Sequence, residues 1–143
     1  MTVRLAEEKD IAAIADLERS CFAEPWTIGQ LAGAFTRTDL CALVVEADGG
    51  IAGYICGTAL FEDAEIARMA VDKNRRRVGL GGKLLDAFLA LVKGRGATRA
   101  FLEVRVSNAA AIGLYRSRGF APLRVRLKYY GDGEDGVEMK KDL

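Results

Sequence analysis

The sequence predicts a mixed α/β (α+β) fold, in which about four helices flank one central, mixed but mostly antiparallel sheet of about seven strands. Three observations predict it. Apolar, β-rich runs alternate with segments whose apolar residues recur at helical spacing. A glycine-containing hairpin turn joins two of the apolar runs. The chain has 143 residues, half of them hydrophobic, with no repeat or linker, so we expect one domain spanning residues 1–143.

The expected helices follow from apolar periodicity and from residues that begin or end a helix. In the first helix, apolar residues fall on one face. Thr27 is the expected N-cap of the second helix. Gly94 ends the third, and Ser107 or Asn108 caps the fourth, after which Gly119 follows. The predicted helices span residues 8–21, 27–35, 79–93 and 108–118.

The expected strands are short runs bounded by turn residues. Ala47–Gly50 is the predicted hairpin turn between the second and third strands, because glycine adopts positive φ without strain. Residues 131–136, rich in glycine and aspartate, form a second turn, which joins the last two strands. The predicted strands span residues 3–5, 40–46, 51–60, 64–71, 100–106, 123–130 and 137–142.

Composition excludes several classes of site. Histidine is absent, which removes the usual base of a catalytic triad and the commonest zinc ligand. The three cysteines, an odd number, are widely spaced at Cys21, Cys41 and Cys56. We therefore expect buried thiols in a reducing cytosol, and no metal site. The net charge of +1 does not favour a direct nucleic-acid role, and no run approaches the ~20 apolar residues that span a membrane. A cytoplasmic protein is expected.

A glycine-rich turn, residues 74–83, precedes the third predicted helix. A helix start offers unpaired N–H groups, glycines let an anion approach them, and arginines 75–77 add charge, so the turn suits a pyrophosphate. A P-loop is excluded because Leu84, not Ser or Thr, follows Lys83. Leu84 also replaces the third glycine of a dinucleotide-binding fingerprint. By itself the turn is also compatible with a solvated basic loop or a nucleic-acid patch.

Two motifs together resemble the GCN5-related N-acetyltransferase (GNAT) family. Arg76-x-x-Gly79-x-Gly81 is similar to the family signature Q/R-x-x-G-x-G/A, whose loop holds the coenzyme A pyrophosphate. Downstream, a strand is followed by the family pattern N-x-x-A-x-x-L-Y-x-x-x-G-F. Its positions are occupied by Asn108, Ala111, Leu114, Tyr115, Gly119 and Phe120. Lys73, Arg76 and Gly82 depart from the residues most frequent in the family, and none of them removes a group that the chemistry needs.

The resemblance implies a GNAT-type fold, acetyl-CoA as co-substrate, no metal, Glu103 as general base and Tyr115 as general acid. A base is needed because an α-amino group, with a pKa near ~7.7–8.0, is partly protonated at neutral pH. From the residues alone, Glu103 is also compatible with an exposed carboxylate or half of an ion pair, and Tyr115 with a core residue. The implied coenzyme-binding residues are Met69, Ala70, Val71, Arg76, Arg77, Val78, Gly79, Leu80, Gly81, Gly82 and Asn108.

Within the family, residues 22–130 are most similar to enzymes that acetylate the N-terminal alanine of ribosomal protein S18. This implies a protein N-terminus as acceptor and places Trp26, Tyr129 and Tyr130 in the acceptor site; these aromatics are also compatible with packing at the sheet end. A small-molecule or polyamine N-acetyltransferase and a non-catalytic acyl-CoA-binding or ribosome-associated module are the alternatives. A monomer or weak dimer is expected.

Overall fold

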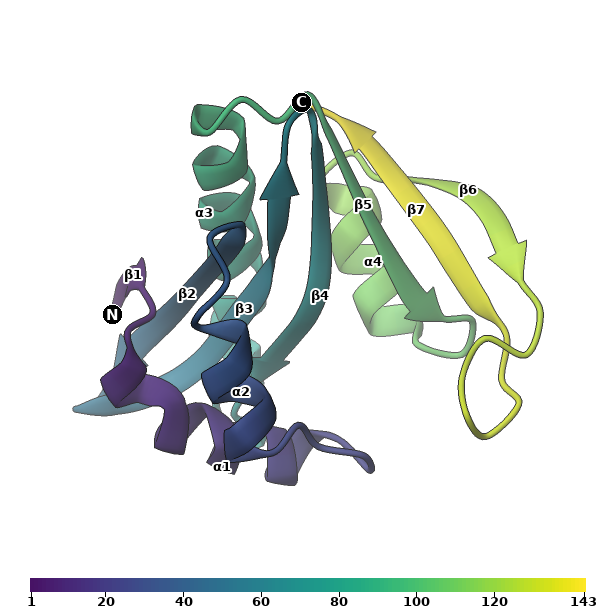
Figure 1. Ribbon diagram of the computed structural model, residues 1–143. Coiled ribbons are helices and arrows are strands. Elements are labelled where there is room, and N and C mark those ends of the chain that lie inside the picture. The colour runs from purple at the N-terminus through teal and green to yellow at the C-terminus, as the bar shows by residue number, and fades with distance from the viewer.

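The computed structural model describes residues 1–143, apart from the side chains of residues 76–78. One seven-stranded sheet has the order β1-β2-β3-β4-β5-β7-β6, and only β4 and β5 pair in parallel (Figure 1). The strands are β1 (Thr2–Leu5), β2 (Leu40–Ala47), β3 (Gly50–Leu60), β4 (Asp63–Val71), β5 (Arg99–Arg105), β6 (Ala121–Arg126) and β7 (Gly136–Asp142). The helices are η1 (Glu8–Asp10), α1 (Ile11–Cys21), α2 (Ile28–Ala34), η2 (Lys73–Val78), α3 (Leu80–Gly94) and α4 (Ala109–Ser117), where η marks a 3-10 helix.

Local signals in the sequence set most element boundaries. Thr27 caps α2: its hydroxyl accepts a hydrogen bond from the Gln30 N–H at 3.1 Å, and the Gln30 side chain accepts one from the Thr27 N–H. Asn108, rather than Ser107, caps α4. Asp48 and Gly49 both have positive φ, as a two-residue hairpin turn of this kind requires. These three predictions are confirmed.

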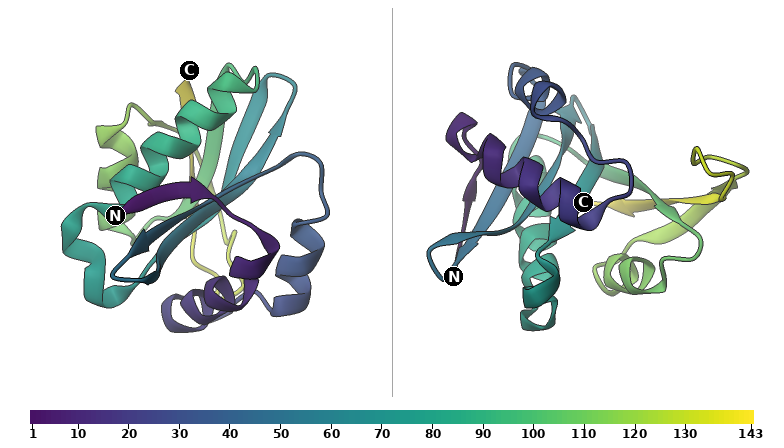
Figure 2. Two further views of the ribbon diagram at one scale, coloured as in Figure 1. Left: turned by 90° about the vertical axis from the view of Figure 1, so that its left-hand side faces the viewer. Right: turned by 90° about the horizontal axis from the view of Figure 1, so that it is seen from below.

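Helices cover the two faces of the sheet unequally. α3 and α4 pack on one face, where α3 residues such as Leu84 and Phe88 meet Leu102 of β5 and Met139 of β7 in the larger core. α1 and α2 pack on the other face, against residues of β2, β3 and β4 only. The view from below in Figure 2 shows the two helix pairs on opposite sides. The predicted fold class is therefore confirmed, and β5, β7 and β6 are left uncovered on the α1–α2 face.

The predicted strand over residues 123–130 is wrong at both ends, because β6 begins at Ala121 and ends at Arg126. Lys128 has a φ of 51°, and its N–H donates to the Asp135 carboxylate at 2.9 Å, so the chain has already turned. Tyr129 and Tyr130 therefore lie in the connection between β6 and β7. The first predicted helix also begins differently, as the 3-10 helix η1. No helix in the described part of the chain is long and apolar enough to cross a membrane.

Candidate active site

The two parallel strands at the centre of the sheet separate part-way along their length. Residues Asp63–Ile66 of β4 pair with Arg99–Leu102 of β5. Beyond Ile66, the described residues of β4 have no register partner on β5, although β4 continues to Val71 and β5 to Arg105. Figure 1 shows the resulting V-shaped gap. The two strands therefore share register partners only over the first part of each.

A β-bulge in β4 accompanies the separation. Gly57 of β3 pairs with Ile66, but the preceding residue, Cys56, pairs with Arg68, so Ala67 is an extra residue in β4. A bulge bends the strand that carries it. Gly57 is required opposite the bulge, because a Cβ there would lie 1.9 Å from the carbonyl oxygen of Glu65. The glycine therefore permits the bend, and β4 leaves β5 at the same place.

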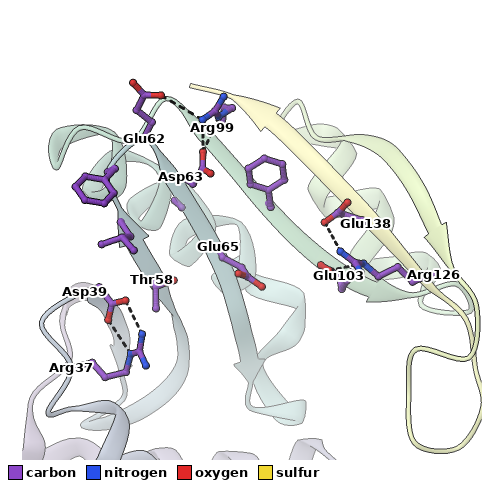
Figure 3. A pocket seen from close by; sticks show the side chains of 14 residues that line it. Arg37, Asp39, Thr58, Glu62, Asp63, Glu65, Arg99, Glu103, Arg126 and Glu138 are labelled. Carbon is purple, nitrogen blue, oxygen red and sulfur yellow. Dashed lines mark hydrogen bonds and ion pairs between the residues drawn. The ribbon is translucent and has the colours of Figure 1, made fainter.

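A cleft of about 740 Å³ lies on the face of the sheet that α3 and α4 do not cover. Figure 3 shows Glu103 of β5 and Glu65 of β4 pointing into this cleft from the two strands that separate. Side chains alternate along β5, so Leu102 and Val104 are buried in the core while Glu103 faces the cleft. Only 12% of the Glu103 side chain is exposed.

Glu103 forms an ion pair, which was one of the two alternatives that the sequence left open. Its Oε1 lies 3.0 Å from Nε of Arg126 on β6. Burial raises the pKa of the Glu103 carboxyl above its ordinary value, the positive charge of Arg126 opposes that rise, and the carboxylates of Glu138 and Glu65 add to it. A carboxylate with a raised pKa beside an open cleft is a stronger base than an ordinary glutamate.

Tyr115 of α4 lies in the core on the opposite face of the sheet from Glu103. It is 7% exposed and belongs to the core that includes Leu102 and Val104, so the core-residue reading of the sequence is also correct. Its ring packs edge-on against Phe120, with centroids 5.8 Å apart. Burial, with a smaller contribution from Tyr130, raises the pKa of Tyr115 to about 12. The phenol therefore keeps its proton at neutral pH.

The glycine turn lies at the far end of the gap. Gly79 has a φ of 73° and begins α3. Gly81 is close to β4, because a Cβ on it would lie 4.0 Å from both the Met69 and Val71 side chains. The first-turn N–H groups of α3 and the end of β4 are thus neighbours, which fits a ligand whose anionic part sits on the helix and whose chain follows the strand.

The other residues predicted to bind the coenzyme have mixed surroundings. The side chains of Arg76, Arg77 and Val78 lie outside the described residues. The Ala70 side chain packs in the α1–α2 core, so only its backbone faces the gap. The side-chain oxygen Oδ1 of Asn108 accepts a hydrogen bond from the Ala111 N–H at the start of α4.

Gly82, a departure from the family pattern, lies under the guanidinium of Arg118. A Cβ at this position would lie 2.4 Å from Nη2 of Arg118. The Arg118 guanidinium crosses the first turn of α3 and is held there by Asp86, with Nε to Oδ1 at 3.0 Å.

Arg75, part of the basic run before the turn, donates a hydrogen bond to the Ala47 carbonyl oxygen at 2.9 Å and so stabilises the β2–β3 hairpin.

Two loops from opposite sides of the molecule meet beside the cleft. A Cβ on Gly131, in the β6–β7 loop, would lie 3.8 Å from Oε1 of Glu24, in the loop between α1 and α2. Trp26 is in the second of these loops and is partly buried against the α1–α2 core. Tyr129 and Tyr130 are in the first, with ring centroids 5.0 Å apart. The three aromatics predicted for the acceptor site are therefore contributed by the two loops that meet.

Tyr130 lies near both candidate catalytic groups. Burial raises the pKa of Tyr130, and neighbouring charges, including that of Glu103, also act on it. Tyr130 in turn adds to the raised pKa of Tyr115. The Arg105 guanidinium stacks 4.2 Å from the centroid of the Tyr130 ring and forms ion pairs with Asp132 and Glu134, which anchors the loop to the end of β5.

Sequence reasoning missed two groups of residues. Arg126 and Glu138 come from β6 and β7, and nothing local shows that they reach Glu103. The fully buried Glu18 accepts hydrogen bonds from Tyr54, Arg68 and the Trp26 N–H, so it fixes the α1–α2 loop. Glu18 had a signal in the sequence: it follows Ile14 by four residues and thus interrupts the apolar face of α1.

Comparisons with known proteins agree with this architecture. Residues 11–120 match the model of the acetyltransferase (GNAT) family. The putative ribosomal protein bS18-alanine N-acetyltransferase of Bacillus subtilis is 38% identical over 140 residues, which cover 96% of this chain and 92% of that protein. The ribosomal protein bS18-alanine N-acetyltransferase of Escherichia coli K12 is 33% identical, with 96% and 95% covered.

Solved structures give the same result. The crystal structure of the ribosomal-protein-S18-alanine N-acetyltransferase from Escherichia coli aligns with a TM-score of 0.91 at 32% identity, covering 99% of this chain and 92% of that one. Ard1 from Thermoplasma volcanium aligns with a TM-score of 0.91 at 28% identity, covering 99% and 97%. Because the family match and the relatives extend along most of its length, this chain belongs to the GNAT family and is an acetyl-CoA-dependent N-acetyltransferase.

Proposed function

We propose that this enzyme transfers the acetyl group of acetyl-CoA to the N-terminal α-amino group of a protein, with the N-terminal alanine of ribosomal protein S18 as acceptor. The proposal rests mainly on the position of Glu103, which borders both the gap between β4 and β5 and the open cleft. The names of the bacterial relatives support S18 as the acceptor. The two loops that bear Trp26, Tyr129 and Tyr130 provide a place for the first residues of a peptide.

In the proposed direct transfer, the acceptor amine enters from the cleft and attacks the thioester carbonyl carbon. The new C–N bond forms as Glu103 takes the proton from nitrogen, directly or through one water. Collapse of the tetrahedral intermediate breaks the C–S bond, and Tyr115 donates its proton to the departing sulfur. A phenol with a pKa of about 12 is protonated at neutral pH, as this role requires. No acyl-enzyme forms, so the cysteines take no part.

The coenzyme would be held along the gap and at the start of α3. The backbone of Met69, Ala70 and Val71 would bind the pantetheine and the acetyl oxygen, since a fixed N–H stabilises the developing oxyanion. The N–H groups of residues 79–82 would bind the pyrophosphate, with Arg76, Arg77 and Val78 beside them and Asn108 at the start of α4. Gly81 at the start of α3 lies beside the side chains of Met69 and Val71, which supports the assignment.

The test measures acetylation of a peptide that begins with alanine and follows the S18 N-terminus, against a panel of free amines including polyamines. We expect Glu103→Gln to lower kcat with the peptide by about 100- to 10,000-fold, the range for loss of a general base. Acetyl-CoA affinity, measured by calorimetry, should stay near that of the wild type. Glu62→Gln is the matched control, because it removes an exposed carboxylate at the end of the cleft away from Glu103 (Figure 3).

Three outcomes would contradict the proposal in different ways. Wild-type turnover by Glu103→Gln across a range of pH would remove Glu103 from the mechanism. A preference for free amines over the peptide would instead make the enzyme a small-molecule or polyamine acetyltransferase. Binding of acetyl-CoA without CoA release in the presence of any acceptor would indicate a non-catalytic module.

A further inference from the structure

Arg126 lies between two carboxylates of the cleft. Its Nε is 3.0 Å from Oε1 of Glu103, and its Nη2 is 3.1 Å from Oε2 of Glu138. Figure 3 shows the guanidinium between these two side chains, which come from the adjacent strands β5 and β7. Two neighbouring carboxylates without a cation between them tend to share a proton, which makes one of them a poor base.

The two contacts of Arg126 are of different kinds. Its Nη2 donates a hydrogen bond to Glu138. Its Nε is buried and, among the described residues, has no hydrogen-bond partner, so the short contact with Glu103 is an ion pair without an aligned N–H. Neither oxygen of Glu103 accepts a hydrogen bond from a described residue. Glu103 is thus held by charge, and its lone pairs remain available to an incoming amine or water.

Charged and titratable groups face Glu103 from every strand and loop around it. Arg126 and the more distant Arg124, both on β6, favour the ionised form, whereas Glu138 on β7 and Glu65 on β4 oppose it. Tyr129 and Tyr130 lie in the β6–β7 loop. Burial works against the charge of Glu138, but the hydrogen bonds from Arg126 and Arg124 hold its pKa below the ordinary value. Glu138 is therefore a fixed negative charge beside Glu103.

We propose that Arg126 is a positioning residue for this acetyltransferase, which keeps Glu103 ionised next to the charge of Glu138 and holds its carboxylate at the edge of the gap. The inference rests on the proposed role of Glu103 as base. Arg126 does not itself contact the reacting atoms. Arg124 is a natural comparison, because it donates to Glu138 at 2.8 Å from the same strand, whereas the ion pair with Glu103 is made by Arg126.

The experiment compares the wild type with Arg126→Gln, Arg126→Lys and Arg124→Gln. The Glu103 carboxyl is titrated by NMR on glutamate-labelled protein, with Glu103→Gln used to assign its signal, and kcat/KM is measured against pH with the alanine peptide. Loss of an adjacent positive charge should raise the Glu103 midpoint by about one pH unit or more in Arg126→Gln. Arg126→Lys should restore most of the wild-type midpoint, and Arg124→Gln should shift it much less.

The pH profile separates a positioning role from a structural one. A shift of one unit lowers kcat/KM about tenfold at pH values below both midpoints, and leaves it near wild type well above them. The acceptor's own ionisation is the same for every variant. Thermal unfolding checks that each variant is folded, which we expect because Arg126 lies on the edge strand of the sheet.

An unchanged midpoint in Arg126→Gln, an equal shift in Arg124→Gln, or a rate lowered equally at every pH would overturn the inference while leaving Glu103 as the base. If the midpoint moves but Glu103→Gln retains wild-type turnover, the proposed base fails, and the role of Arg126 in the reaction fails with it.

Discussion

At the scale of single residues, the two candidate catalytic groups lie on opposite faces of the sheet. Strand alternation turns Glu103 to the cleft and its neighbours Leu102 and Val104 to the core, where Tyr115 packs with them. Burial raises the pKa of both groups, but the consequence differs between them. It makes the carboxylate more basic, and it prevents the phenol from ionising.

We expect Tyr115→Phe to lower kcat by about 100-fold or more, because general-acid assistance to the departing sulfur is lost. Its stability should change little, since the Tyr115 hydroxyl has no hydrogen-bond partner among the described residues. Activity assays and urea unfolding of the same preparation check both statements. Wild-type kcat in this variant would show that the thiolate leaves without help from Tyr115.

Tyr54→Phe makes the same chemical change at another buried tyrosine. It should lower stability and leave activity largely intact, the opposite of Tyr115→Phe. The Tyr54 hydroxyl donates to Glu18, which is fully buried. Losing a hydrogen bond to a charged group costs about 1.5–3 kcal/mol. We therefore expect a lower free energy of unfolding in urea, with kcat of the folded enzyme reduced far less than in Tyr115→Phe. Equal losses of kcat in both variants would contradict this separation of roles.

At the scale of elements, the bulge in β4 and the glycine opposite it shape the site. The pairing of β4 with β5 stops at Ile66, immediately before the extra residue Ala67. Gly57 carries no side chain that would keep β3 away from the bulge. The absence of a Cβ at Gly57 of β3 therefore allows β4 to bend away from β5, which opens the gap.

Gly57→Ala should destabilise the protein by about 1–3 kcal/mol or more, because the new Cβ meets a backbone oxygen that no rotamer change can move. It should also weaken acetyl-CoA binding, since the gap lies beside the displaced strand. Gly50→Ala, in the same strand, is the control, because its Cβ would meet nothing within 4 Å. Urea unfolding and calorimetry with acetyl-CoA measure the two effects. Similar stabilities for the two variants would rule out this role for Gly57.

At the scale of the whole molecule, ion pairs between arginines and buried carboxyls join different elements of the fold. Arg4 of β1 donates two hydrogen bonds to the buried Asp10 of η1, at 2.8 and 2.9 Å. These bonds lower the pKa of Asp10, outweighing its burial. Glu138, held by two arginines of β6, has a lowered pKa as well. Both carboxyls therefore contribute to stability only while they are ionised.

The sign of the resulting pH dependence is fixed by linkage. A carboxyl whose pKa is lowered by folding stabilises the protein above its unfolded pKa, about 4, and this contribution is lost as the pH falls further. We expect Asp10→Asn to lower the free energy of unfolding at neutral pH and to flatten its decrease toward acid pH. Asp16→Asn, at an exposed carboxylate of α1, should leave the curve parallel to that of the wild type. Urea unfolding at several pH values tests this, and parallel curves for both variants would exclude Asp10 as a contributor.

Much of this protein follows from local sequence. Apolar periodicity predicted seven strands and four helices in their correct order. The cap Thr27 placed the start of α2, and the start of α4 was predicted to within one residue, with Ser107 or Asn108 as its cap. Period-two alternation along a strand places Glu103 on the face opposite to Leu102 and Val104. These features were predictable because they depend on backbone geometry within a few residues. Residues 127–130 were assigned wrongly because an apolar and aromatic run is equally compatible with a strand and with a loop that Asp135 closes from a distance.

The tertiary structure alone decided what surrounds the candidate base. Strand order places β7 between β5 and β6, and this brings Glu138 and Arg126 to Glu103 from segments that no local pattern connects. Register decides that Gly57 faces the bulge, and helix packing decides that Arg118 crosses Gly82. The sequence by itself determined the elements and which side chains are candidates for the chemistry. Long-range strand pairing and packing determined their charge environment, because those contacts depend on the free energy of the whole fold rather than on neighbouring residues.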